Sequence, residues 1–152
     1  MKQIEEIKQR PKMQSIVFML NECCDSFDAL IEINRLYSQM IKASSEEKGR
    51  MVLSPEAIVK ILGTTRDSFC IRLASLFDKR KDTYSIDKFF KGDIVDKLRD
   101  HQITVAAIMA RHNNICHMGK KYIKWPDIEQ IVNSNIGEML KNIRISVLLN
   151  KC

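Results

Sequence analysis

The sequence predicts an all-α protein, and more closely an up-and-down bundle of four main helices with one extra short helix. Apolar residues recur at helical spacing in four long segments. Glycine and proline are scarce, at 5 and 3 of 152 residues, which argues against a turn-rich β architecture. No run of alternating β-branched and polar residues is bounded by turn residues, so no strand competes with the helices.

The first two helices are predicted from their apolar stripes and their starting residues. The first covers residues 13–41, and Pro11 either begins it or separates it from a short leading helix. The polar stretch "KASSEEKGR" that follows is expected to be an exposed connection. The run Ser-Pro-Glu at 54–56 supplies an N-cap, a first-turn proline and an early acid for a second helix that extends to Phe77. Gly63 marks a place where this helix is weak.

The third and fourth helices lie in the second half of the chain. A short helical turn at 85–90, burying one of two adjacent phenylalanines, is expected in the linker that precedes them. The third helix then begins near Asp93 and runs without interruption into "ARHNNICHMGKKY", residues 110–122. Its apolar stripe, expected to point inward, consists of Ile94, Leu98, Val105, Ile108 and Met109. A new start, marked by Trp125, Pro126, Asp127 and Glu129, begins the last helix. The tryptophan is expected to pack against that helix in preference to stacking on a nucleic-acid base.

Length and cysteine usage indicate the class of protein. The chain, 1–152, is long enough for a single domain with a real core and too short for two ordinary ones. Its five cysteines form no CxxC pair and are odd in number, which favours reduced thiols in a cytoplasmic protein. No secretory signal is visible and no apolar run is long enough to span a bilayer, so no membrane partner is expected.

The charge is distributed unevenly. The net charge is +6, yet residues 1–76 hold eleven basic and ten acidic residues, whereas residues 77–152 hold fourteen and nine. This asymmetry favours an anionic partner, with nucleic acid ahead of a membrane surface. The simpler interpretation, a soluble protein that is merely basic, is equally consistent with these numbers.

The geometry of the stretch at 110–122 follows if the third helix continues through it. Successive side chains are then about 100° apart around the helix axis. With Val105 at the centre of the buried stripe, His112 and Cys116 both fall within about 20° of it and are expected to face the core. The face turned away from the core carries three polar residues: Arg111, Asn114 and His117.

Arg111 and His117 are too far apart on one helix to form a tight pair. A two-fold axis passing Asn114 would bring two arginines and two histidines from two chains into one cleft. A homodimer with a composite site is therefore expected.

The order of Arg111, the polar His112 and then His117 is similar to the R-polar-x(3 to 5)-H signature of the HEPN superfamily. The phrase "RHNNICH" before a basic turn, with "DSFCIRLASLFDK" one helix earlier, most resembles the abortive-infection AbiU-like branch of that superfamily. The likeness covers roughly Met13 to Val147 in helix order and motif position. It implies a HEPN-like bundle, a metal-independent endoribonuclease without cofactor, a role as toxin or anti-phage effector, and RNA and an antitoxin protein as partners.

The resemblance also implies roles for individual residues. His117 would move a proton between the ribose 2′-hydroxyl and the departing 5′-oxygen, giving a 2′,3′-cyclic phosphate and a 5′-hydroxyl. Arg111 would bind the scissile phosphate, and Asn114 would hold a phosphate or sugar oxygen or orient His117. Further candidates for contacts with RNA are Asn113, Lys120, Lys121 and Lys124.

Several alternatives stay open beside this interpretation. The lysines at 120–124 suit a solvated basic turn as well as an RNA contact, and the basic run at 79–81 is expected to be solvated only. A zinc site is disfavoured because the nearby histidines and Cys116 do not give a closed four-ligand spacing. A Cys116–His117 nucleophile and base pair is disfavoured because neighbouring side chains on a helix diverge. The alternative function is a non-catalytic helical module that binds RNA or a protein.

Overall fold

A computed structural model describes residues 2–80, 83–116 and 122–149, with side chains described for 12–80, 83–115 and 122–149. These residues form helices and connections and no strand, which confirms the all-α prediction. The elements in chain order are α1 (Lys2–Lys42), α2 (Ser45–Gly49), α3 (Pro55–Ser75), the 3-10 turn η1 (Ile86–Lys88), α4 (Asp93–Asp100), α5 (Gln102–Arg111), the π-helical turn η2 (His112–Cys116), α6 (Ile128–Val132) and α7 (Ile136–Leu149).

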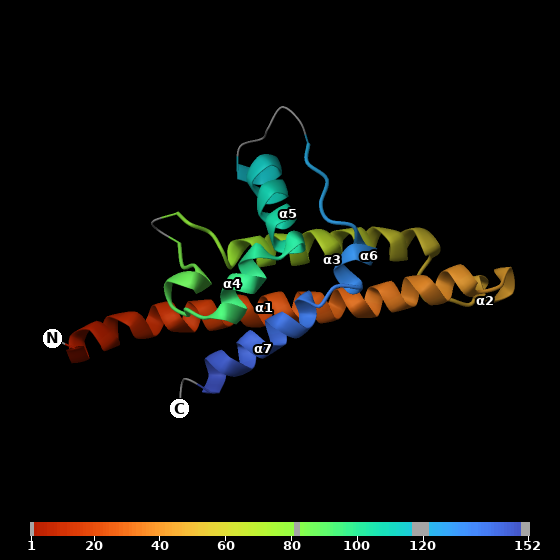
Figure 1. Cartoon of the computed structure of the whole chain (residues 1–152). Coiled ribbons are helices and arrows are strands. Elements are labelled where there is room, and N and C mark those ends of the chain that lie inside the picture. The colour runs from red at the N-terminus through yellow and green to blue at the C-terminus, as the bar shows by residue number, and fades with distance from the viewer. Residues whose placement is uncertain (1, 81–82, 117–121, 150–152) are drawn as a thin grey trace.

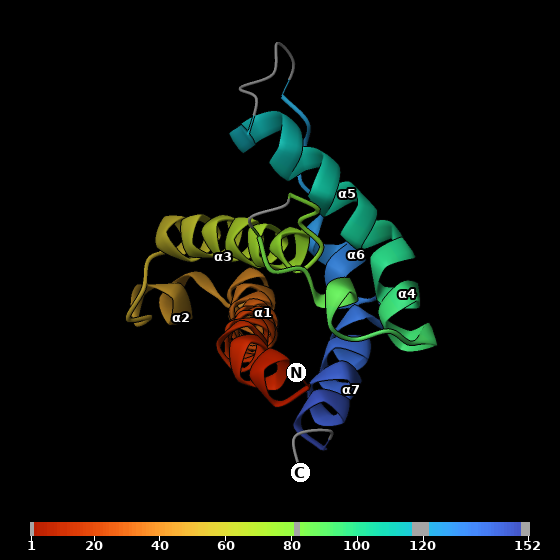
Figure 2. The ribbon, with the colours of Figure 1, turned by 90° about the vertical axis from the view of Figure 1, so that its left-hand side faces the viewer.

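The long helix α1 is the spine of the molecule (Figure 1). Helix α3 runs back along it, and α7 packs against another side of it. Helix α4 lies beside α7, while α5 packs on α3 and points its C-terminal end away from α1 (Figure 2). The stretch at 110–122 is therefore carried at the projecting end of α5.

One buried cluster joins these helices. It includes Phe27 on α1 and Phe69 on α3, whose tilted rings have centroids 5.4 Å apart. Gly137 on α7 lies directly against the Phe27 ring, which allows α7 to approach α1 closely. The largest fully buried side chains are Phe69, Ile16, Leu20, Leu30, Leu73, Leu76, Ile86, Leu98, Ile131, Ile136, Leu140 and Ile143.

The first two predicted helices are present, with changes at their ends. Helix α1 begins well before residue 13 and contains Pro11 within its bounds. The exposed stretch after α1 includes α2, because Ser44 and Glu47 form a reciprocal capping box. Helix α3 starts as predicted, with the Ser54 hydroxyl accepting from the Ala57 N–H, and it continues through Gly63 without a break.

The linker before α4 buries a different residue from the one predicted. Ile86 in η1 is fully buried and its N–H donates to the carbonyl of Leu76 at 2.8 Å, whereas Phe89 and Phe90 are only partly buried. The isoleucine is the one held against the end of α3 by a backbone hydrogen bond.

The third helix is interrupted, contrary to prediction. His101 has extended backbone (φ −63°, ψ 135°) and separates α4 from α5. Its Nδ1 accepts from the Ile103 N–H at 3.2 Å, so the histidine is the N-cap of α5, and its Nε2 lies 3.2 Å from Oδ1 of Asn135.

The last predicted helix is also divided, into α6 and α7. Asp127 and Gln130 form a capping box at the start of α6. Trp125 is 5% exposed and packs in the core, as predicted, so its ring is not accessible for stacking on a base. Within the described part of the chain, no helix has the length and apolar character needed to cross a bilayer.

Candidate functional site

The break at His101 changes which face of α5 is buried. Val105 and Met109, both predicted to point inward, are 43% and 55% exposed. The side chains of α5 that are buried are Ile103, Thr104, Ala107 and Ala110. The predicted stripe was wrong because its phase was extended from Ile94 and Leu98 across a helix boundary.

The predicted orientations of the motif residues are wrong for the same reason. His112 is exposed, although it was placed on the core face, while Arg111 and Asn114 are partly buried, although they were placed on the outer face. Beyond Arg111 the chain widens into the π-helical turn η2, so a rotation of 100° per residue no longer applies. Asn113, also in η2, is half-buried.

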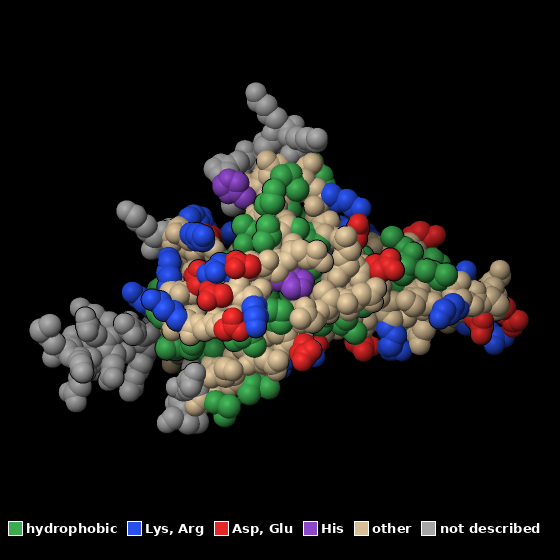
Figure 3. Space-filling model, in the orientation of Figure 1, with side chains coloured by type: hydrophobic (Ala, Val, Ile, Leu, Met, Phe, Trp, Pro, Cys, Tyr) green, Lys and Arg blue, Asp and Glu red, His purple; other side chains and the backbone are tan. Residues whose placement is uncertain are grey.

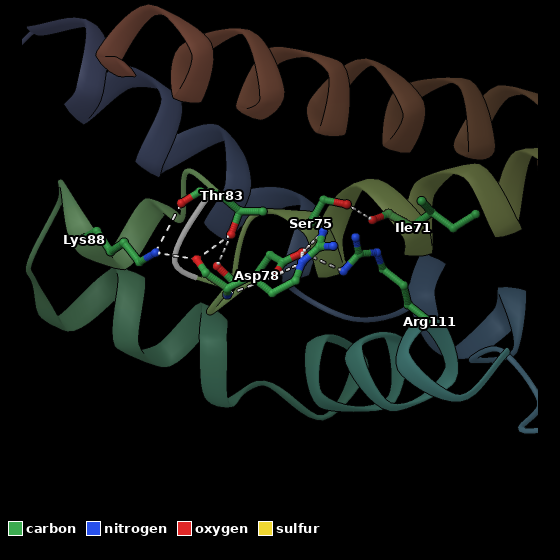
Figure 4. A network of polar contacts seen from close by, with 7 residues as sticks. Ile71, Ser75, Asp78, Thr83, Lys88 and Arg111 are labelled. Carbon is green, nitrogen blue, oxygen red and sulfur yellow. Dashed lines mark hydrogen bonds and ion pairs between the residues drawn. The ribbon is translucent and has the colours of Figure 1, made fainter. Parts of the chain in front are cut away.

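Arg111 points toward the end of α3, where Asp78 lies (Figure 4). Its Nη1 is 3.1 Å from Oδ2 of Asp78, and the Arg111 and Asp78 side chains are 19% and 8% exposed. Arg80 approaches the same carboxylate with Nη2 at 2.8 Å, with Nε at 3.1 Å from both oxygens, and with its backbone N–H at 3.1 Å from Oδ1. Two arginines thus share one nearly buried carboxylate.

This environment stabilises the charged form of Asp78. Hydrogen bonds from Arg80, and then from Arg111, hold the pKa of Asp78 well below its usual range despite the opposing effect of burial. The connection around it is fixed further by Lys88, whose Nζ donates to the carbonyls of Arg80 and Thr83 at 2.9 and 3.1 Å (Figure 4). No pattern in the sequence indicates this contact, since Asp78 precedes a charged run typical of a solvated linker.

Asn114 has a different partner from the one expected. Its Nδ2 donates to the carbonyl of Ile123 at 2.6 Å and its Oδ1 accepts from the Ile123 N–H at 2.9 Å. The amide therefore pairs with the backbone of the returning chain in the manner of a strand. Asn114 thus holds residue 123 close to the end of α5. Both the amide nitrogen and the amide oxygen of Asn114 are engaged in this contact.

A cleft of about 600 Å³ lies beside Arg111, between the end of α3, helix α4 and helix α5. Its lining includes Lys79 and Arg80, which the sequence suggested were solvated only, and His112. Figure 3 shows basic and acidic side chains gathered beside hydrophobic ones next to the projecting part of the molecule. The lining residues are Ala74, Phe77, Asp78, Lys79, Arg80, Arg99, Asp100, Val105, Ile108, Met109, Arg111 and His112.

Of the remaining predicted site residues, only Lys124 is described. His117, Lys120 and Lys121 lie outside the described residues, and so does the side chain of Cys116. Lys124 is exposed and pairs with Asp127 at 2.7 Å, at the start of α6. It does not line the cleft.

The chemistry available at the cleft is that of cations and an imidazole. In the described ranges, no group of three His, Cys, Asp or Glu side chains is placed to hold a metal ion. Cys23, Cys24 and Cys70 are buried among α1 and α3, and burial raises the pKa of each thiol, that of Cys70 to about 12.

Comparisons with models of known protein families, with curated proteins and with solved structures found no match to this chain.

Proposed function

We propose that this chain is a metal-independent endoribonuclease of the HEPN type that acts as a toxin or anti-phage effector. It would cut RNA by attack of the ribose 2′-hydroxyl, leaving a 2′,3′-cyclic phosphate and a 5′-hydroxyl. One observation carries the proposal: Arg111, the arginine of the motif, lies in a cleft that it shares with cations from two other segments, Lys79 and Arg80 after α3 and Arg99 on α4.

Arg111 suits the role of phosphate ligand. Asp78 fixes the guanidinium through Nη1, and a guanidinium carries five N–H donors, so others are left for a phosphate in the cleft. A donor held in place before the substrate arrives stabilises the charge that develops on the phosphate without further reorganisation. Asp78 is thus a positioning residue in this proposal.

The proton transfers are assigned to His117, whose neutral imidazole is suited to general acid and base catalysis near pH 7. The clamp between Asn114 and Ile123 fixes the described chain on both sides of the segment 117–121. His112, which lines the cleft together with Arg111, is the competing candidate for the same role.

The assembly in this proposal is a homodimer with RNA as substrate and an antitoxin protein as a further partner. Its protomer would be a HEPN-like bundle of four helical segments, which are α1, α3, α4 with α5, and α6 with α7. A two-fold axis passing Asn114, at the projecting end of the molecule, would bring two copies of Arg111 and His117 together.

The test is cleavage of an unstructured RNA by the purified protein in EDTA. We expect His117→Ala and Arg111→Ala each to lower the cleavage rate by about 100-fold or more. Arg50→Ala is the matched control, since Arg50 is an exposed arginine at the end of α2 and should leave the rate unchanged. If His112→Ala removes activity and His117→Ala does not, the assignment of the base is wrong.

The second candidate is a non-catalytic helical module that binds RNA or a protein. It is favoured by the contacts of Arg111 and Asn114, both of which have structural partners within the chain. Folded wild-type protein that leaves RNA intact in EDTA, with and without each substitution, would support the module and overturn the nuclease.

A further inference from the structure

The cleft beside Arg111 has a wall that phosphate binding does not require. Val105, Ile108 and Met109 occupy one face of α5 and line the cleft opposite Ala74 and Phe77 at the end of α3. Val105 and Met109 are about half exposed to solvent, although they are apolar. A groove that bound only a sugar-phosphate backbone would gain nothing from this surface.

The rim of the same cleft is charged. Four of its lining residues are Lys or Arg and two are Asp, which makes it electropositive. Asp78 is fully engaged by its arginines, and Arg99 pairs with Asp96 and Asp100 at 2.9 and 3.0 Å. Lys79 and Arg80 stand at the exposed edge, beside the apolar wall.

These features together select the chemistry of an occupant. An occupant that fits must have an anionic group to pair with the Lys and Arg side chains and an apolar surface to pack on the wall. It must also have hydrogen-bonding groups for polar lining atoms such as the Asp100 carboxylate. A nucleotide has all three, because a nucleobase is apolar on its faces and carries hydrogen-bond donors and acceptors on its edge. A fatty acid lacks the polar edge. The volume, about 600 Å³, is typical of a small-molecule site, which spans about 300–1,000 Å³.

We propose that this cleft receives one unpaired nucleobase of the RNA, packed against Met109 and Val105, with the adjoining phosphates held by Lys79 and Arg80. This proposal rests on the proposed function, because that function identifies the bound strand as RNA. It deepens that function by restricting the substrate to RNA with an unstacked base at this position. The unbranched thioether of Met109 adapts to bases of different size, which predicts weak discrimination among them.

The test is binding of a short single-stranded 2′-O-methyl RNA. This strand cannot be cleaved, because it lacks the free 2′-hydroxyl that attacks the phosphate. Fluorescence anisotropy would compare this strand with the same strand made abasic throughout. We expect Met109→Ser to weaken binding of the base-bearing strand about tenfold and to leave the abasic strand unchanged. Ile145→Ser, which changes an equally exposed apolar residue on α7, is the control and should alter neither.

Three outcomes would overturn the proposal. The first is equal affinity of the wild type for the base-bearing and abasic strands. The second is that Met109→Ser and a second variant, Val105→Ser, both bind the base-bearing strand as tightly as the wild type does. The third is binding of free adenosine monophosphate as tight as that of the strand, which would identify the occupant as a free nucleotide.

The two proposals fail in different ways. Binding that depends on Met109, with no cleavage of the matched unmodified RNA in EDTA, supports the base-binding cleft and overturns the nuclease. Cleavage of that RNA with binding unaffected at Met109 and Val105 supports the nuclease and overturns the base-binding cleft.

Discussion

Replacing Asn114 by alanine tests whether this residue is a structural clamp or a catalytic group. The substitution removes two hydrogen bonds, of 2.6 and 2.9 Å, to the backbone of Ile123. Each such bond contributes about 1 kcal/mol net, and a partner left unsatisfied costs more. Because Ile123 is partly buried, we expect the free energy of unfolding to fall by about 2 kcal/mol.

For a chain of this length, a loss of about 2 kcal/mol corresponds to a decrease in Tm of about 4–8 °C. Urea unfolding gives the free energy, and hydrogen exchange at the Ile123 amide gives the local effect, where protection should be lost. Asn114→Asp should also destabilise, because a carboxylate accepts from the Ile123 N–H but cannot donate to its carbonyl. Asn142→Ala, at an exposed position of α7, is the matched control and should change stability by less than about 0.5 kcal/mol.

The reasoning is refuted if Asn114→Ala retains the wild-type Tm and the protection of the Ile123 amide. Such a variant, if it also failed to cleave RNA, would return Asn114 to the catalytic role that the sequence suggested.

Three further predictions concern the fold around the site. Gly137→Ala places a Cβ 2.1 Å from Cε1 of Phe27 and should cost about 1–3 kcal/mol by urea unfolding; in a Phe27→Leu background this cost should largely disappear. Because the pKa of Asp78 is lowered in the folded state, its contribution to stability should be complete above about pH 5 and decline as the pH falls below about 4. The stability difference between wild type and Asp78→Asn, followed by thermal unfolding against pH, should therefore shrink on acidification, and a constant difference would contradict the assignment. His101→Ala should lower the free energy of unfolding by about 1 kcal/mol through loss of the cap, and His101→Ser should restore most of it.

The sequence by itself determined the helical class and the starts of two helices. The start at Ser54 and Pro55 is confirmed, and so is a helix start next to Pro126 and Asp127, because such start signals depend on residues within four positions of one another. The burial of Trp125 also followed from its place just before a helix start. The choice of Arg111 as a site residue is compatible with its position in a basic cleft, while its role stays a prediction.

The orientation of α5 was decided only by the tertiary structure. His101 ends one helix and caps the next with an imidazole that reaches Asn135, a residue 34 positions away. No glycine or proline marks that break, so the apolar period was extended across it and assigned Val105 to the core. The partners of Arg111 and Asn114 were likewise invisible, because Asp78 and Ile123 reach them through packing between segments that are 33 and 9 residues apart in the chain. Local propensity sets which residues are helical, whereas the contacts between helices set which way each side chain points.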